Sequence, residues 1–89
     1  MKYLLVYENG DLSRAAAHFP EHRARWKQFA DKSLLMMVGP VLNSPLFGAL
    51  GVFVTREAAE EFANGDPFVL NGVVARWSIA EWKEALVNP

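Results

Sequence analysis

The sequence predicts an α+β domain with a ferredoxin-like β-α-β-β-α-β order and a four-stranded antiparallel sheet. Four short apolar runs rich in β-branched and aromatic residues alternate with two segments of helical periodicity, and turn residues stand at the junctions. The 89 residues form one predicted domain, 1–89, in which 82–89 is a short C-terminal tail. Two helices would then cover one face of the sheet and leave the other face open.

The first half of the chain supplies two strands and a long helical segment. Residues 2–7 form an apolar run closed by an Asn-Gly pair, which is typical of a buried first strand. Residues 11–33 carry helical signals, with Ser13 as the N-cap of a first turn and Pro20 as the first residue of the main helix. Residues 34–38 are all apolar and precede a Gly-Pro pair, which predicts a second strand buried on both faces.

The second half predicts a strand, a helix, a short turn and a final strand. Residues 49–55 are β-rich, and Thr55 can cap a helix that an Asn-Gly pair ends. The apolar stripe of that helix consists of Ala58, Ala59, Phe62 and Ala63. Asp66 and Pro67 then begin a fresh turn, as N-cap and first helical residue.

The last strand covers residues 73–80 by its alternating pattern. Val73, Ala75, Trp77 and Ile79 are expected on one face, and Val74, Arg76, Ser78 and Ala80 on the other. The tail after it has the spacing of one helical turn through Trp82, Ala85 and Leu86.

Composition and charge exclude several classes of function. The formal net charge of -1 gives no basic excess for nucleic acid. Without cysteine, the chain has no disulfide, thiolate metal site or cysteine nucleophile. The apolar N-terminal run is too short for a signal peptide, and no stretch reaches the length of a membrane span. We therefore expect a cytoplasmic, soluble protein.

The pattern of the strands also predicts association with a second copy. The second, third and last strands carry apolar residues for both of their faces. An open apolar sheet face on so small a domain favours face-to-face homodimerisation.

The ordered motifs of the chain resemble the YCII (YciI-like) family. They are Pro20-Glu21-His22, a helix, Gly39-Pro40 after the second strand, Asp66-Pro67-Phe68, and Asn71-Gly72 before the last strand. The resemblance covers residues 2–82 and implies a dimeric α+β barrel with a His and an Asp meeting in a pocket between helix and sheet. On these positions the implied catalytic pair is His22 and Asp66. Phe68 and Pro40 are candidates to line the same pocket and bind substrate.

Each member of this pair has a structural alternative. His22 shares a helix face with Trp26 and Phe29, so it can simply pack there, although an imidazole is also suited to proton transfer near neutral pH. Asp66 before Pro67 is what a plain N-cap looks like, and one carboxylate can cap a helix and also meet an imidazole.

Other chemistry-bearing residues have weaker support. His18 and His22 have the i,i+4 spacing of two metal ligands, but a helix break at Pro20 argues against a metal site. Arg25 and Arg76 suit either an anionic substrate or solvent. Ser44 lacks the surroundings of a serine nucleophile.

The sequence thus predicts a cofactor-free enzyme that uses His22 as general acid and base on a small organic molecule, by elimination, hydration or isomerisation. The first alternative is a non-catalytic dimeric module that binds a small ligand or serves as an accessory subunit. The second is a cofactor-free oxygenase of the related dimeric ferredoxin-like barrels.

Overall fold

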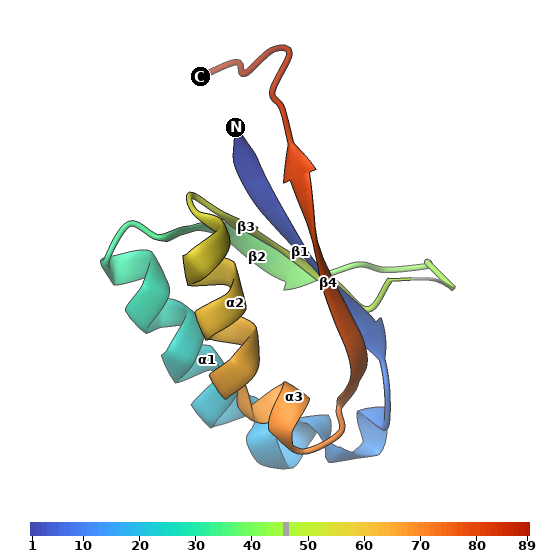
Figure 1. Cartoon of the computed structure of the whole chain (residues 1–89). Coiled ribbons are helices and arrows are strands. Elements are labelled where there is room, and N and C mark those ends of the chain that lie inside the picture. The colour runs from blue at the N-terminus through green and yellow to red at the C-terminus, as the bar shows by residue number, and fades with distance from the viewer. Residues whose placement is uncertain (46) are drawn as a thin grey trace.

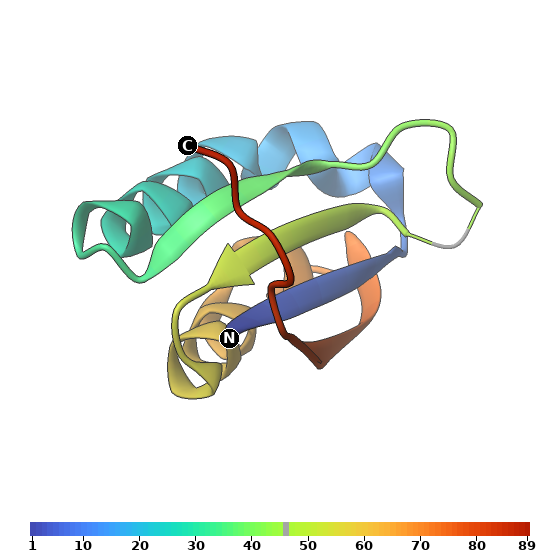
Figure 2. The same ribbon diagram turned by 90° about the horizontal axis from the view of Figure 1, so that it is seen from above.

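The computed structural model describes residues 1–45 and 47–89 and confirms the predicted order of elements. Its elements are β1 (Lys2–Asn9), η1 (Leu12–Arg14), α1 (Ala15–Asp31), β2 (Leu35–Pro40), β3 (Ala49–Phe53), α2 (Arg56–Gly65), α3 (Pro67–Leu70) and β4 (Val74–Trp82). The strands form one antiparallel sheet in the order β2-β3-β1-β4. Helices α1 and α2 cover one face of this sheet, as Figures 1 and 2 show. This is the ferredoxin-like arrangement that the sequence predicts.

The core lies between the sheet and these two helices. Alternation along β1 turns Leu5 and Tyr7 toward the helices, and both side chains are buried. The ring of Phe53 on β3 lies 6.2 Å from that of Phe29 on α1 and 5.4 Å from that of Phe62 on α2, and the latter two rings are 5.2 Å apart. Edge-to-face and tilted pairs of this kind add stability beyond the burial of their area.

The second helix forms and ends as its sequence predicts. Its predicted stripe is buried, and the Thr55 hydroxyl accepts a hydrogen bond from the Ala58 N–H at 3.1 Å. The helix ends at Gly65, after which Asp66 caps α3 and Pro67 takes its first position. These caps bring the chain sharply back toward the sheet, which sets the position of Asp66.

The long helix differs from the prediction at its start. Helix α1 begins at Ala15 and runs continuously through Pro20, and Asp11 rather than Ser13 caps the turn η1 that leads into it. A proline at the sixth helical position removes a single backbone hydrogen bond. The Asp11-capped turn feeds α1 directly, so the helix is already established where the proline occurs.

Both ends of the last strand also differ from the prediction. A β-bulge places one extra residue opposite β1 between Arg76 and Val74, so Val74 turns into the core instead of sharing the Arg76 face. At the other end Trp82 still pairs with Lys2, and the residues after it form no helical turn. Instead Glu84 binds the Lys2 ammonium at 2.8 Å and the N-terminal amine at 2.9 Å. These two cations lower the pKa of the Glu84 carboxyl to about 2.

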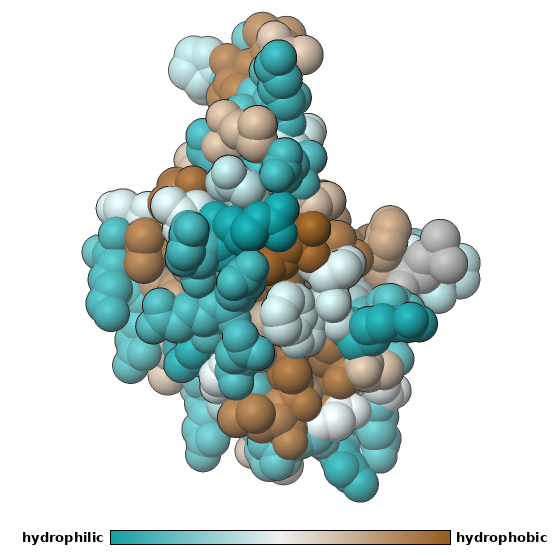
Figure 3. All heavy atoms as spheres, in the orientation of Figure 1, coloured by the Kyte–Doolittle hydropathy of each residue, from teal (hydrophilic) through white to brown (hydrophobic). Residues whose placement is uncertain are grey.

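The face of the sheet opposite the helices is apolar and open in the single chain. Leu4 and Val6 alternate with the buried residues of β1, and Leu50 lies opposite Val6 on β3. On β2, Met36 and Met37 are 59% and 70% exposed, so this strand is not buried on both faces within one chain. In the space-filling view, hydrophilic residues dominate over the helices, while hydrophobic ones gather near the sheet and around α3 (Figure 3).

Candidate functional site

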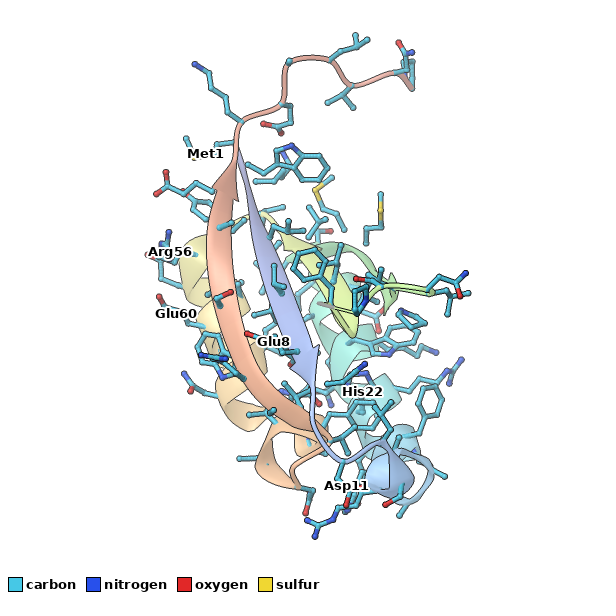
Figure 4. All side chains as sticks on the ribbon, turned by 90° about the vertical axis from the view of Figure 1, so that its right-hand side faces the viewer. Met1, Glu8, Asp11, His22, Arg56 and Glu60 are labelled. Atoms are coloured by element: carbon cyan, nitrogen blue, oxygen red, sulfur yellow. The ribbon has the colours of Figure 1, made fainter. Side chains whose placement is uncertain are left out.

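A cavity of about 310 Å³ opens between α1, α3 and the end of the sheet at which β1 and β2 end. Its walls are mostly apolar, and its lining includes Tyr7, Asn9, His22, Trp26, Pro40 and Phe68. The volume is at the small end of the range for small-molecule sites. In Figure 4, which looks onto the sheet from the side away from the helices, His22 lies beside the lower end of β1, toward the end of the molecule marked by Asp11.

The cavity contains the predicted histidine, and the predicted aspartate lies directly behind it. Nδ1 of His22 lies 2.7 Å from Oδ1 of Asp66, within the expected hydrogen-bond distance. The His22 side chain is 12% exposed and the Asp66 side chain is fully buried. A carboxylate can only accept a hydrogen bond, so the donor to Asp66 is an N–H group at Nδ1. In a neutral imidazole the lone pair is then on Nε2.

Asp66 is held by two further donors besides the imidazole. The Phe68 N–H donates to Oδ1 at 3.1 Å, which is the N-cap bond of α3. The Tyr7 hydroxyl donates to Oδ2 at 2.6 Å. Oδ1 thus both caps α3 and accepts the hydrogen bond of the imidazole, and Oδ2 accepts the hydrogen bond of Tyr7. Three donors on a carboxylate with no exposed surface fix its position and complement its negative charge.

Tyr7 is the residue of this site that the sequence does not reveal. Burial, and then the negative charge of Asp66, raise the pKa of its phenol far above the usual value of 10.0. The hydroxyl therefore keeps its proton, and can donate to Asp66, well above the pH at which an ordinary tyrosine ionises. The available signal was its strand position: Tyr7 follows Leu5 by two on the inward face of β1, and a buried tyrosine hydroxyl needs a partner.

Aromatic rings fix the orientation of the imidazole. Phe68 stacks on one face of the His22 ring, with centroids 3.8 Å apart and planes within 2° of parallel. Phe19 and Phe62 contact the ring at centroid distances of 6.2 and 6.3 Å. Among the described residues, no group hydrogen-bonds Nε2. Nε2 is thus the ring nitrogen without a protein partner in the described part of the chain, and its ring lines the cavity.

The two predicted substrate-binding residues both line this cavity. Phe68 does so as the stacking partner of His22, and it lies between the Asp66 cap and the Phe19 ring. Pro40, the last residue of β2, is exposed and forms part of the rim. The structure therefore gathers His22, Asp66, Phe68 and Pro40 at one place.

The other candidates lie outside the cavity lining. His18 shares a continuous helix with His22, but the described residues contain no group of three or more His, Asp or Glu that could hold a metal ion. Arg25 donates to the carbonyl oxygens of Phe62 and Glu61, at 3.1 and 2.7 Å, and so ties α1 to the end of α2. Arg76 pairs with Glu8 at 3.0 Å. Within the described part of the chain, no helix is long and apolar enough to cross a membrane.

The fold and site together define a class: a ferredoxin-like α+β domain in which a histidine that lines an apolar pocket is paired with a buried carboxylate. The family model of the YCII-related domain matches residues 1–83 of the sequence, and the chain belongs to that family.

One solved structure with this fold is 5-chloro-2-hydroxyhydroquinone dehydrochlorinase (TftG) from Burkholderia phenoliruptrix AC1100, in complex with 2,5-dihydroxybenzoquinone. It superposes with a TM-score of 0.76 over 96% of each chain at 20% sequence identity. At that identity the likeness concerns the fold. Comparison with curated protein sequences gives no significant match.

Proposed function

We propose that this protein is a small-molecule enzyme that uses His22 as general base and general acid, with no cofactor. The observation that supports the proposal best is the pairing, at 2.7 Å, of Nδ1 of His22, which lines the cavity, with Asp66, which is buried and does not line it. Nε2 is then the position that takes a proton from a bound molecule and returns it. Asp66 orients the ring and stabilises the imidazolium formed in between.

The proposed reaction class is an elimination, with hydration and isomerisation as related possibilities. Each of these needs one proton removed and one delivered, which a single imidazole can do in sequence. The likeness in fold to a dehydrochlorinase supports elimination, because loss of HCl from a ring is a reaction of this type. Phe68 would hold the imidazole in plane, and Pro40 would shape the rim through which the substrate passes.

The test measures chloride release from 5-chloro-2-hydroxyhydroquinone and other chlorinated hydroquinones. The wild type and a His18→Gln control should release chloride, because His18 lies outside the cavity lining. His22→Gln should lose turnover by about 10²-fold or more while its circular dichroism spectrum stays unchanged. Equal turnover in His22→Gln would refute the role of His22. Ligand binding without turnover across the series would favour the alternative, a non-catalytic binding module.

We include a homodimer in the proposal, formed through the open face of the sheet. Leu4, Val6 and Leu50 give that face an apolar centre, and Met37 extends it along β2. A stable interface should bury at least about 1,000 Å² in total. In sedimentation velocity at micromolar concentration the wild type should be a dimer and Val6→Glu a monomer, because the substitution places a charge at the centre of the interface. A monomeric wild type would refute the dimer.

A further inference from the structure

The lining of the cavity combines aromatic rings with a near absence of charge. Within the described part of the chain, its polar side chains are those of Tyr7, Asn9, His22 and Trp26, and none of its residues is Lys, Arg, Asp or Glu. The Tyr7 hydroxyl is already committed to Asp66. A ligand inside therefore meets rings, aliphatic groups, the amide of Asn9, the indole N–H of Trp26 and one imidazole nitrogen, and no charged side chain.

None of the arginines of η1 and α1 lines the cavity. Arg25 is held by two carbonyl oxygens of α2, and Arg14 by Asp11 and the carbonyl of Asn71. Arg23 lies on the exposed side of α1, over the Trp26 ring. Asp66 already places one negative charge directly behind His22. A carboxylate or phosphate in this cavity would be buried without a fixed partner, which is costly.

The same surroundings favour a flat ring. Phe68 covers one face of His22, so a ligand reaches Nε2 along its edge, in the plane of the imidazole. A planar molecule in that position lies among the rings of Phe19, Trp26 and Phe62. A volume of about 310 Å³ suits a compound of one or two rings.

We infer that the cavity binds uncharged, planar aromatic compounds, of which the hydroxy-aromatic ones are its substrates, and rejects aromatic compounds that carry a carboxylate or phosphate. The inference deepens the proposed function and rests on it, since it names the substrate class of the same site. In the proton-transfer step, the ligand O–H bond breaks and an N–H bond forms at Nε2, which gives a phenolate and an imidazolium. This transfer leaves the total charge of ligand, His22 and Asp66 unchanged, whereas a ligand that arrives as an anion adds a second negative charge.

Three probes of nearly equal size test this selection: 4-nitrophenol, 4-nitroanisole and 4-nitrobenzoate. Their affinities are measured by titration calorimetry at a pH below the titration of free 4-nitrophenol. We expect 4-nitrophenol and 4-nitroanisole to bind, and 4-nitrobenzoate to bind about tenfold more weakly or worse. The variant Asn9→Lys places a cation at the exposed rim and should recover binding of 4-nitrobenzoate. Comparable affinity of the wild type for 4-nitrobenzoate and 4-nitrophenol would overturn the inference.

The absorbance of bound 4-nitrophenol separates this inference from the proposed function. The wild type and His18→Gln should show the phenolate band on binding, and His22→Gln should not. Charge selection without a phenolate band would refute His22 as the base and leave the selectivity standing. A phenolate band together with tight binding of 4-nitrobenzoate would refute the selectivity and leave the base standing.

Discussion

Replacing Tyr7 by Phe should remove a specific pH dependence from the stability of the fold. The phenol of Tyr7 keeps its proton in the folded chain because burial and Asp66 raise its pKa above the ordinary 10.0. In the unfolded chain the same phenol ionises near pH 10. Above that pH the unfolded state binds fewer protons than the folded state, so the free energy of unfolding falls as pH rises.

The size of the effect follows from the two titrations. Tyr7 contributes its full stabilisation below pH 10, and above it the loss approaches about 1.4 kcal/mol per pH unit until the pKa of the folded state is reached. Between pH 8 and pH 11 the loss due to Tyr7 is therefore about 1.4 kcal/mol. The Tyr7→Phe variant should lack this loss, and at pH 8 it should be about 1.5–3 kcal/mol less stable because Asp66 Oδ2 loses its donor.

Urea unfolding followed by tryptophan fluorescence measures both quantities. Wild type, Tyr7→Phe and the matched control Tyr3→Phe are compared at pH 8 and pH 11, so that other titrating groups cancel. Tyr3→Phe should retain the loss that Tyr7 causes. If Tyr7→Phe loses as much stability between the two pH values as the wild type does, the hydroxyl of Tyr7 is not buried against Asp66.

Two further substitutions test how the site is built. Asp66→Asn keeps an oxygen for the Phe68 N–H but removes the charge that His22 and Tyr7 contact. The free energy of unfolding at pH 7 should therefore fall by about 1–3 kcal/mol. A change near zero would mean that Asp66 acts only as a helix cap. Gly65→Ala would force its new Cβ against the Arg25 guanidinium and disturb two hydrogen bonds, so unfolding should need about 1–2 kcal/mol less. In an Arg25→Ala background the same change should have little effect, and full additivity in this double-mutant cycle would contradict the contact.

The order of elements was predictable because each depends on local signals. Alternation, helical periodicity and turn pairs lie within a few residues of one another, and the caps at Thr55 and Asp66 need no knowledge of the rest of the chain. The errors in the last strand arose because pairing with a distant strand decides its register and its end. The bulge that turns Val74 inward and the extension of β4 to Trp82 both follow from the register against β1.

The site was predictable only in part, for the same reason. Motif order pointed to His22 and Asp66, which are 44 residues apart, and the structure brings them to 2.7 Å. Tyr7 lies 59 residues before Asp66, and only the packing of β1 against the end of α2 shows that its hydroxyl completes the carboxylate. The charge-free lining of the cavity likewise depends on where Arg25 and Arg76 find their partners.

In the proposed mechanism, Asp66 holds His22 so that Nε2 is a free base facing the cavity. The ¹⁵N chemical shifts of the His22 ring, recorded at a pH where the ring is neutral, test this claim directly. The chain has two histidines, so a His18→Gln variant assigns the signals. We predict the tautomer with the proton on Nδ1, in the wild type and in His18→Gln alike. A neutral ring with its proton on Nε2 would mean that Nε2 cannot accept a proton, and would contradict the proposed role of His22.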